Sequence, residues 1–293
     1  MASRRVEVDV DGRRLSLSNL DKVLYPQVGF TKGQVIDYYT RIAPYVLPHL
    51  RDRPLTMKRY PNGVEDKFFY EKRCPSHAPD WIRREEFLGI EYCVCDDLPT
   101  VVWLANMADL ELHPSLSKVE DPNRPTVMAF DLDPGPGAGL PECCEVAFIL
   151  REALKQLKLE CFAKTSGSKG IQVYVPLNVD DVDYDHGTKA LSHALARHLE
   201  AQHPKLIVSS QKKELRQDKV LIDWSQNDEH KTTVGVYSLR ARERPTVSTP
   251  LAWEELDEPE LLVFEAADVL ERVERDGDLF APVVELRQEL PDL

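Results

Sequence analysis

The sequence lacks several features that would each fix a class of protein. No apolar run approaches the roughly 20 residues of a membrane span, and no apolar signal segment follows the first arginines. No internal repeat or low-complexity segment is visible. These absences predict a cytoplasmic protein with no membrane partner, whose 293 residues are ample for a buried core.

Cysteine is scarce and shows no metal-binding pattern. None of the six cysteines forms a CxxC pair, which argues against a structural zinc site. We therefore expect reduced thiols within a cytosolic core. The cysteines are Cys74, Cys93, Cys95, Cys143, Cys144 and Cys161.

Positive charge is also in deficit, since the net charge is −13. The deficit is concentrated in residues 254–293, which hold 14 Asp and Glu against 3 Lys and Arg. The remainder of the chain is nearly neutral. Because binding follows the local field more than the total charge, a basic surface for nucleic acid is compatible with this composition.

The element pattern changes along the chain. An Asp11-Gly12 turn predicts a hairpin, a capping box at Thr31–Gln34 predicts a helix start, and a second helix is expected over 99–112. After Pro125 strands alternate with helices, which predicts a mixed sheet. We expect strands at 126–133, 160–165, 171–177, 219–224 and 233–240, and helices at 142–157, 186–203 and, in the acidic segment, across 254–276.

Carboxylates at strand ends are the most informative feature that is present. Asp131 and Asp133 close an apolar run, and on a strand they project from one face while Leu132 faces the core. Such a pair is either an acidic strand end before a Pro-Gly turn or a site for Mg²⁺ or Mn²⁺. Asp223 ends another apolar strand, and three carboxylates can hold two divalent ions.

The segment 166–170, Ser-Gly-Ser-Lys-Gly, lies between two predicted strands, so it is not a Walker loop. Its glycines allow close backbone approach, its N–H groups could form an anion nest, and Lys169 adds a charge. A plain hairpin is the alternative.

Basic residues recur on both sides of this loop. If 233–240 continues as a strand, Arg240, Arg242 and Arg244 face one way, either as a solvated edge or as phosphate contacts. An earlier stretch, 58–73, interleaves cations with aromatic residues, as base stacking with backbone contact requires. A further basic run comprises Lys212, Lys213, Arg216 and Lys219.

Four separated motifs, at 19–26, 130–135, 166–170 and 223–227, together resemble the polymerase domain of bacterial end-joining ligases (LigD), of the archaeo-eukaryotic primase superfamily. The resemblance runs from about residue 15 to about residue 280. It implies an α+β primase-polymerase fold with an RRM-like catalytic unit, as one domain over 1–293. Within it we expect an N-terminal lobe (1–115), a catalytic sheet unit (116–250) and an acidic segment (251–293). No ligase or nuclease module is present in this sequence, so we expect a stand-alone polymerase.

The resemblance implies a template-dependent DNA/RNA nucleotidyltransferase that fills gaps and extends ends in double-strand break repair. It further implies two Mn²⁺ or Mg²⁺ ions, a ribonucleotide preference and a location at the nucleoid. The implied partners are DNA with a 5′-phosphate at a gap or break, NTPs or dNTPs, Ku and a separate DNA ligase.

Residue roles carry over from the same resemblance. Asp131, Asp133 and Asp223 would be the metal ligands and catalytic carboxylates. Nucleotide binding would fall to Ser166, Lys169, Gly170, Gln172, His113, Lys58, Arg240, Gln226 and Arg216. Asn19, Lys22 and Lys32 would bind the DNA 5′-phosphate, and Phe69 and Tyr70 would stack on bases.

Two departures from the family pattern affect this interpretation. Gln172 stands where the family usually has histidine, and glutamine cannot carry a proton or a positive charge. Gly235-Val236 replaces the usual Ala-Pro before Tyr237. The first departure keeps open a catalytically weak or inactive module that binds DNA ends. A third hypothesis is that the acidic cluster belongs to a metal-dependent phosphohydrolase.

Overall fold

The computed structural model describes residues 5–291, so the N-terminal residues 1–4, where no signal segment is predicted, lie outside it. Its helices are α1 (Lys32–Leu50), α2 (Leu98–Asn106), α3 (Leu140–Gln156), α4 (Lys189–Gln202), α5 (Ala266–Asp276) and α6 (Pro282–Glu285). The strands before residue 115 are β1 (Arg5–Val10), β2 (Arg13–Ser18), β3 (Val23–Tyr25), β4 (Phe30–Thr31), β5 (Pro54–Arg59), β6 (Phe69–Glu71), β7 (Arg84–Phe87), β8 (Ile90–Val94) and β9 (Asp109–Pro114). The later strands are β10 (Val127–Pro134), β11 (Phe162–Thr165), β12 (Ile171–Pro176), β13 (Ile207–Val208), β14 (Val220–Asp223) and β15 (Pro250–Leu251).

The later strands form one six-stranded sheet in the order β13-β14-β10-β12-β11-β15. All neighbouring pairs are antiparallel except β13 and β14. Alternate residues of β10 enter different cores, because side chains on a strand alternate between faces. Met128 and Phe130 pack with α3 and α4, whereas Val127 and Ala129 pack toward the N-terminal lobe. Strand β10, which carries Asp131 and Asp133, is therefore packed on both faces.

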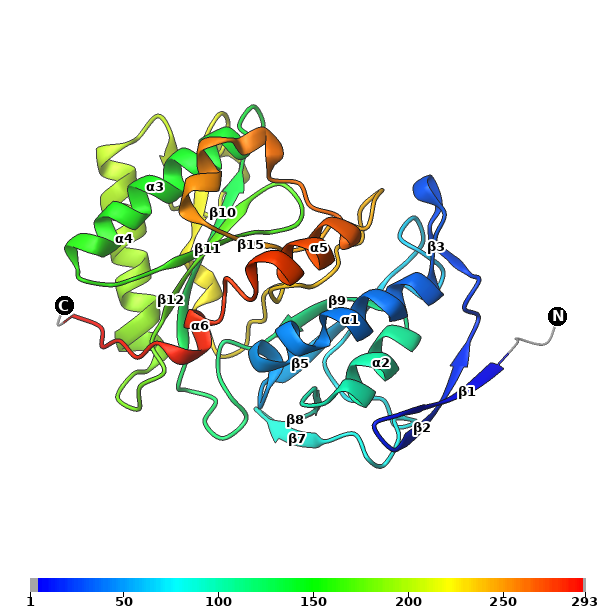
Figure 1. Cartoon of the computed structure of the whole chain (residues 1–293). Helices are drawn as coiled ribbons and strands as arrows, with labels where there is room; N and C mark the ends of the chain where they lie inside the picture. Colours follow the sequence, from blue (N-terminus) through cyan, green and yellow to red (C-terminus); the bar gives the residue numbers. More distant parts are fainter. Residues whose placement is uncertain (1–4, 292–293) are drawn as a thin grey trace.

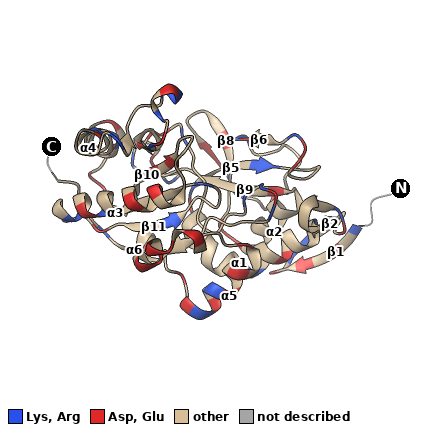
Figure 2. Ribbon diagram, turned by 90° about the horizontal axis from the view of Figure 1, so that it is seen from above, with Lys and Arg blue, Asp and Glu red and all other residues tan. Residues whose placement is uncertain are grey.

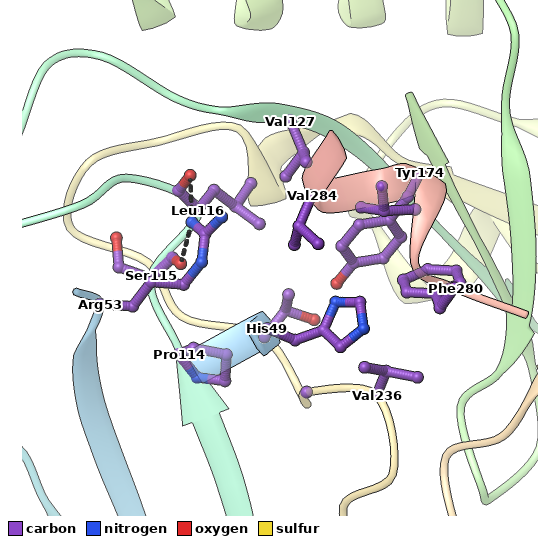
Figure 3. Close-up of a pocket in the computed structure, with 13 residues that line it drawn as sticks. His49, Arg53, Pro114, Ser115, Leu116, Val127, Tyr174, Val236, Phe280 and Val284 are labelled. Atoms are coloured by element: carbon purple, nitrogen blue, oxygen red, sulfur yellow. Dashed lines mark hydrogen bonds between the residues drawn. The ribbon is translucent and has the colours of Figure 1, made fainter. Parts of the chain in front are cut away.

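The N-terminal lobe contains a second sheet, β6-β5-β8-β7, with β9 on the other edge of β5. Helices α1 and α2 pack together on this lobe, and Figures 1 and 2 show it lying beside the six-stranded sheet with α3 and α4. Where the lobes meet, a cavity of about 40 Å³ lies between His49 at the end of α1, Tyr174 on β12 and Phe280 (Figure 3). Nearby, Arg53 donates to the carbonyl oxygens of Ser115 and Leu116. Arg53 also donates to Thr126 Oγ1, directly before β10, so a buried polar contact joins the two lobes.

Most predicted elements are confirmed. The first hairpin pairs β1 with β2, and Thr31 and Gln34 form the capping box that opens α1. The strands and helices expected between 126 and 224 are all present within a few residues of their predicted bounds. The acidic segment is helical in pieces, since two short 3₁₀ turns precede α5.

The helix predicted over 99–112 is wrong in its second half. Helix α2 ends at Asn106, Ala108 has a φ of 56°, and the chain then enters β9. Leu110 and Leu112 enter the core as alternate residues of a strand, because β9 pairs along β5. Strand β5 lies far from β9 in the sequence, so this pairing cannot be predicted from residues 99–112 alone.

The strand predicted over 233–240 is also wrong. The segment makes only isolated bridges, Ser115 with Thr232 and Leu239 with Val247. Tyr237 has a φ of 62°, which interrupts an extended strand. The following arginines accordingly do not share a face. Arg240 reaches Ser166 and Glu111, Arg242 reaches Ser168, and Arg244 reaches Glu265.

The expectation of six reduced thiols is wrong for one pair. Cys74 and Cys93 form a disulfide between the segment after β6 and strand β8. Folding brings their Cα atoms to within 4.8 Å of each other, and a sequence separation of 19 residues does not by itself predict this proximity. The other four cysteines are free and buried.

The C-terminal segment connects the two lobes. Asp278 accepts hydrogen bonds from the Tyr237 hydroxyl at 2.6 Å and from the Phe280 N–H at 2.9 Å, and its other carboxylate oxygen lies 2.8 Å from His49 Nε2. Helix α5 lies against α1, and α6 lies against β12 (Figure 1). Within residues 5–291, no helix has the length and apolar character that crossing a membrane requires.

Candidate active site

Four side chains form a row across the six-stranded sheet, each on a different strand. Asp223 of β14 is paired with Asp131 of β10, Asp131 with Gln172 of β12, and Gln172 with Lys164 of β11. Residues directly opposite on neighbouring strands share a face, so these four form a cross-strand row, the name used below. Asp133 lies two residues beyond Asp131 on the same face. The sheet therefore presents three carboxylates, an amide and an ammonium group side by side.

The two middle members of the cross-strand row, Asp131 and Gln172, line a cavity of about 400 Å³. Both lobes contribute to its walls, because Tyr70 and His113 come from the N-terminal sheet and Asp131 from the six-stranded sheet. The full lining is Tyr70, His113, Asp131, Asp133, Pro134, Ser166, Ser168, Lys169, Gln172, Arg216, Gln226, Thr232, Thr233, Val234, Arg240 and Arg242. The structure thus gathers most of the residues to which the sequence assigns nucleotide binding.

The carboxylates are held where their negative charge is unfavourable. Burial, and then Asp133, raises the pKa of Asp131 to about 7, although a hydrogen bond from the Gln172 side chain lowers it. Burial and then Asp223 raise the pKa of Asp133. Asp131 Oδ1 is buried without a hydrogen-bond partner. Converging carboxylate oxygens with an unused acceptor are the donor set that Mg²⁺ and Mn²⁺ favour, so Asp131 and Asp133 fit such an ion.

Asp223 lies opposite Asp131 in the register of the sheet, but its carboxylate oxygens already accept hydrogen bonds from other residues. Its Oδ1 accepts from the Ser225 N–H at 2.9 Å and from Gln211 Nε2 at 2.7 Å, and its Oδ2 accepts from Gln226 Nε2 at 3.0 Å. Among the described residues, no three His, Cys, Asp or Glu side chains are arranged to hold a metal ion. The role of Asp223 as third ligand therefore stays a prediction, and it requires Gln211 to release the carboxylate.

The loop 166–170 is built for close packing. A Cβ on Gly170 would lie 2.2 Å from the Leu132 carbonyl oxygen, so only glycine fits beside β10. Ser166 Oγ accepts from the N–H groups of Ser168 at 3.3 Å and Gly170 at 3.1 Å. Those two N–H groups are thus used within the loop and do not form the expected nest. Lys169 lines the cavity as its cationic contribution.

Glu111 connects three of the predicted nucleotide-binding residues. Its Oε2 lies 3.2 Å from Lys58 Nζ, 3.0 Å from His113 Nε2 and 3.4 Å from Arg240 Nε. Its Oε1 accepts from the N–H of Ala241. Burial opposes its ionisation, but His113, Arg240 and Lys58 outweigh burial and hold the pKa of Glu111 well below its usual range. Glu111 therefore fixes the position of cations on this wall of the site.

The aromatic side chains of β6 remain accessible. Tyr70 is 58% exposed and meets His113 edge to face, with ring centroids 6.0 Å apart. Phe69 is 53% exposed but is not among the residues that line the cavity. Lys58 Nζ lies 5.5 Å from the Tyr70 ring centroid, which positions a cation against the exposed ring.

The three residues predicted to bind a 5′-phosphate form a separate group, away from the cavity lining. The Lys22 N–H donates to Asn19 O, and the Lys32 N–H donates to Lys22 O. Lys32 Nζ donates to Ser18 O at 2.7 Å, and Lys22 Nζ donates to Pro61 O at 2.6 Å. Burial, and then Lys22, lowers the pKa of Lys32 to about 8.

Arg216 and Gln226 extend the wall around the carboxylates. Arg216 lines the cavity, donates to Gln211 O at 2.7 Å and lowers the pKa of Asp133. Gln226 lines it as well. Together with Gln211 they place hydrogen-bond donors around Asp223 and a positive charge near Asp133.

Sequence reasoning missed three functional candidates: Glu111, Lys164 and Gln211. The signal for Glu111 was its alternation with His113, which the expected helix over 99–112 obscured. The signal for Lys164 was a lone charge inside the short strand Phe162–Thr165. Gln211 carries no local signal, because its contact with Asp223 depends on how the loop folds over β14.

The α+β fold, with paired aspartates facing a cavity rimmed by cations, is that of a primase-polymerase. The family model described as "LigD, primase-polymerase domain" matches residues 31–280, and the chain belongs to this family.

Curated relatives cover nearly the whole chain. The multifunctional non-homologous end joining protein LigD of Mycolicibacterium smegmatis is 41% identical over 276 residues, which are 92% of this chain and 36% of that protein. The bifunctional non-homologous end joining protein LigD of Bacillus subtilis is 30% identical over 267 residues, which are 90% of this chain and 43% of that protein. The chain thus spans less than half the length of these relatives.

A solved structure agrees with this assignment. The polymerase domain of Mycobacterium tuberculosis ligase D, in complex with DNA, superposes with a TM-score of 0.87 at 40% identity. The match covers 94% of this chain and 99% of that chain.

Proposed function

We propose that the protein is a template-dependent nucleotidyltransferase that fills gaps and extends ends during double-strand break repair by end joining. The observation that carries the proposal is the convergence of Asp131 and Asp133 on the same cavity as Lys169, Arg240 and Tyr70. Carboxylates for divalent ions, cations for phosphates and an exposed ring for a base are the three requirements of nucleotide addition.

Each wall of the cavity has a separate task in this proposal. Lys169, Arg240 and Arg216 bind the triphosphate of the incoming nucleotide through charge-assisted hydrogen bonds. Tyr70 stacks on a base, and His113 donates or accepts a hydrogen bond beside it. Two Mn²⁺ or Mg²⁺ ions, held by Asp131, Asp133 and Asp223, would lower the pKa of the primer 3′-hydroxyl and neutralise charge on the α-phosphate.

The DNA contact extends beyond the cavity. The solved relative is a complex with DNA, which supports a DNA substrate for this chain. Asn19, Lys22 and Lys32 bind the 5′-phosphate across a gap in this proposal, and Phe69 contacts the template. A ribonucleotide preference, cooperation with Ku and sealing by a separate DNA ligase belong to the same proposal, since the curated relatives are end-joining proteins.

A second candidate is a module that binds DNA ends without catalysis. It is favoured by Gln172 at the usual histidine position and by the hydrogen bond from Gln211 to Asp223.

One experiment separates these candidates. The protein is incubated with a gapped duplex bearing a 5′-phosphate, Mn²⁺ and labelled NTPs or dNTPs. Extension that follows the template selects the polymerase, and tight binding without extension selects the module. Release of phosphate from the nucleotide without extension selects a phosphohydrolase and refutes the proposal.

A further inference from the structure

Lys164 is a charged side chain enclosed within the protein beside the cavity. It is 0% exposed and lies on β11 at the end of the cross-strand row. Its ammonium donates to Gln172 Oε1, to the Ser248 hydroxyl at 2.7 Å and to the Val234 carbonyl at 3.1 Å. These three acceptors use all three N–H bonds of the lysine, and all three are neutral oxygens. Burying a cation without a directly paired anion is costly, so its position calls for an explanation other than packing.

The contact with Lys164 determines which way the Gln172 amide faces. A lysine ammonium only donates hydrogen bonds, so the Gln172 atom that meets it must be the oxygen. The NH₂ group then points to the opposite side, where it donates to Thr233 Oγ1 at 3.1 Å and hydrogen-bonds the carboxylate of Asp131. Gln172 and Thr233 both line the cavity. Without the lysine, the amide could turn over and present an acceptor to the cavity in place of a donor.

Lys164 also contributes charge to the cross-strand row. The carboxylates of Asp131, Asp133 and Asp223 repel one another from one end of the row, and the neutral amide of Gln172 cannot compensate them. The ammonium of Lys164 lies one strand beyond Gln172, and it stabilises the ionised form of Asp131. Burial lowers the pKa of Lys164 to about 7 and Asp131 opposes that effect, so protonated Lys164 counters the accumulation of negative charge from inside the sheet.

We propose that Lys164 is a positioning residue for this active site: it fixes the Gln172 amide with its NH₂ group toward the cavity, and it supplies there the positive charge that glutamine lacks. The Gln172 N–H groups are thereby held toward Thr233 and the carboxylate of Asp131, in the wall of the site that binds a nucleoside triphosphate under the proposed function. The inference rests on that function for its kinetic test, but its structural test is independent of it.

The structural test uses the side-chain NH₂ resonances of Gln172, labelled with ¹⁵N and identified by their loss in Gln172→Glu. In the parent protein we expect a pair of separated resonances that exchange slowly with solvent. Lys164→Met removes the charge at similar length, and we expect the resonances to shift and their hydrogen exchange to accelerate about tenfold or more. Lys205→Met, at an exposed lysine, is the matched control. Unchanged Gln172 resonances in Lys164→Met would overturn the proposal.

The kinetic test is a double-mutant cycle between Lys164 and Gln172. Gln172→His alone places an imidazole against the buried ammonium, and Lys164→Met alone frees the amide. Each should raise the KM for the nucleotide or lower kcat about tenfold. The double variant Lys164→Met with Gln172→His should recover most of that loss, because the imidazole then has room and can carry the charge. Effects that simply add would show that the two residues act separately and would overturn the proposal.

Two further comparisons distinguish a failure of the positioning role from a failure of the proposed function. If the parent protein incorporates no nucleotide on the gapped duplex, the proposed function fails, while the resonance test still decides the positioning role. If Lys164→Met does not fold, Lys164→Gln takes its place, since an amide keeps a hydrogen-bond donor while removing the charge. That variant should retain the Gln172 resonances and still lose nucleotide affinity. Retention of both would refute the charge contribution.

Discussion

A single carboxylate, Glu111, holds together the cationic wall of the candidate site. Three nitrogens from Lys58, His113 and Arg240 lie within 3.4 Å of its Oε2. It is 1% exposed, so water cannot replace it as their acceptor. The wall is therefore sensitive to one residue that need not touch a substrate.

Glu111→Gln should keep the shape of this wall and remove its charge. Because Lys58 and Arg240 then lose their common anion and His113 loses an ionised partner, we expect the KM for the nucleotide to rise about tenfold and the melting temperature to fall. Burial already lowers the pKa of His113, and Glu111 opposes that effect, so the pKa of His113 should fall further in the variant. Nucleotide titrations with the gapped duplex and an NMR titration of His113 measure both effects. Glu145→Gln on the exposed face of α3 is the control, and equal KM values in both variants would contradict the role of Glu111.

Asp131→Asn and Asp133→Asn should each abolish nucleotide incorporation and leave DNA binding largely intact. Either substitution should also raise the melting temperature in metal-free buffer, because two like charges no longer converge at the end of β10. Primer extension, a gel-shift assay and calorimetry test the three parts separately. Asp80→Asn, at an exposed position, is the control. Normal extension by either variant would refute the assignment of these carboxylates.

The site residues that could be predicted are those with a local signature. Asp131 and Asp133 follow an apolar strand and share a face by simple alternation, and Lys169 lies in a glycine loop between two strands. Lys164 and Gln211 act on Gln172 and Asp223 through contacts that depend on the assembled sheet. Gln211 lies only 12 residues before Asp223, but no pattern between them indicates that the loop folds back over β14.

At the scale of elements, the hairpin of β11 and β12 positions the loop 166–170 against β10. The loop needs glycine at two positions for different reasons. Gly167 has a φ of 65°, and a Cβ there would lie 2.7 Å from Ser248 N. Gly170 has ordinary φ but no room beside the Leu132 carbonyl. The close packing of the loop against β10 thus places Lys169 in the cavity that Asp131 and Asp133 also line.

Gly170→Ala should disturb this packing. The added methyl group would meet the Leu132 carbonyl at 2.2 Å, which requires β10 and the loop to separate beside Asp131 and Asp133. We expect a loss of about 1–3 kcal/mol in the free energy of unfolding and a larger loss of incorporation rate. Urea denaturation and primer extension measure these effects. Gly139→Ala, where the nearest atom is 3.6 Å away, should change neither, and equal behaviour of the two variants would contradict the argument.

Elements with their own start signals were predictable. Helix α1 opens on a capping box and the first hairpin on an Asp-Gly turn, and both are confirmed. Strand β9 and the irregular segment 232–240 were not, because their conformations follow from neighbours distant in sequence. Strand β9 is defined by β5, and the later segment is held by Ser115 and by Val247.

At the scale of the whole molecule, the acidic C-terminal segment acts as a connection between lobes. Asp278 joins His49 of α1 to Tyr237. Burial alone would raise its pKa, but His49 and Tyr237 outweigh burial and hold the pKa of Asp278 below its ordinary value. A carboxyl whose pKa is lower in the folded than in the unfolded protein stabilises the fold at pH values above the unfolded pKa. This contribution is lost as the pH falls through the folded pKa.

Asp278→Asn should therefore lower the free energy of unfolding by about 1–3 kcal/mol at neutral pH. The difference from the parent protein should shrink as the pH falls below about 4, since the parent carboxyl then protonates as well. Denaturation at a series of pH values measures both effects. Asp276→Asn, whose partner is the neighbouring exposed Arg275, is the control and should have little effect. A difference that does not change with pH would contradict the ionic contribution.

The members of the cross-strand row come from four strands, and Asp131 meets Asp223 only after β14 has paired with β10. A nascent chain that ends before residue 223 can display the Asp131–Asp133 pair, but nothing completes it. Assembly of the acidic end of the sheet thus waits for one of the most distant pairings in the fold. Under the proposed function, the complete set of three carboxylates for divalent ions should consequently appear late, together with the cooperative completion of the sheet, and not in any early hairpin.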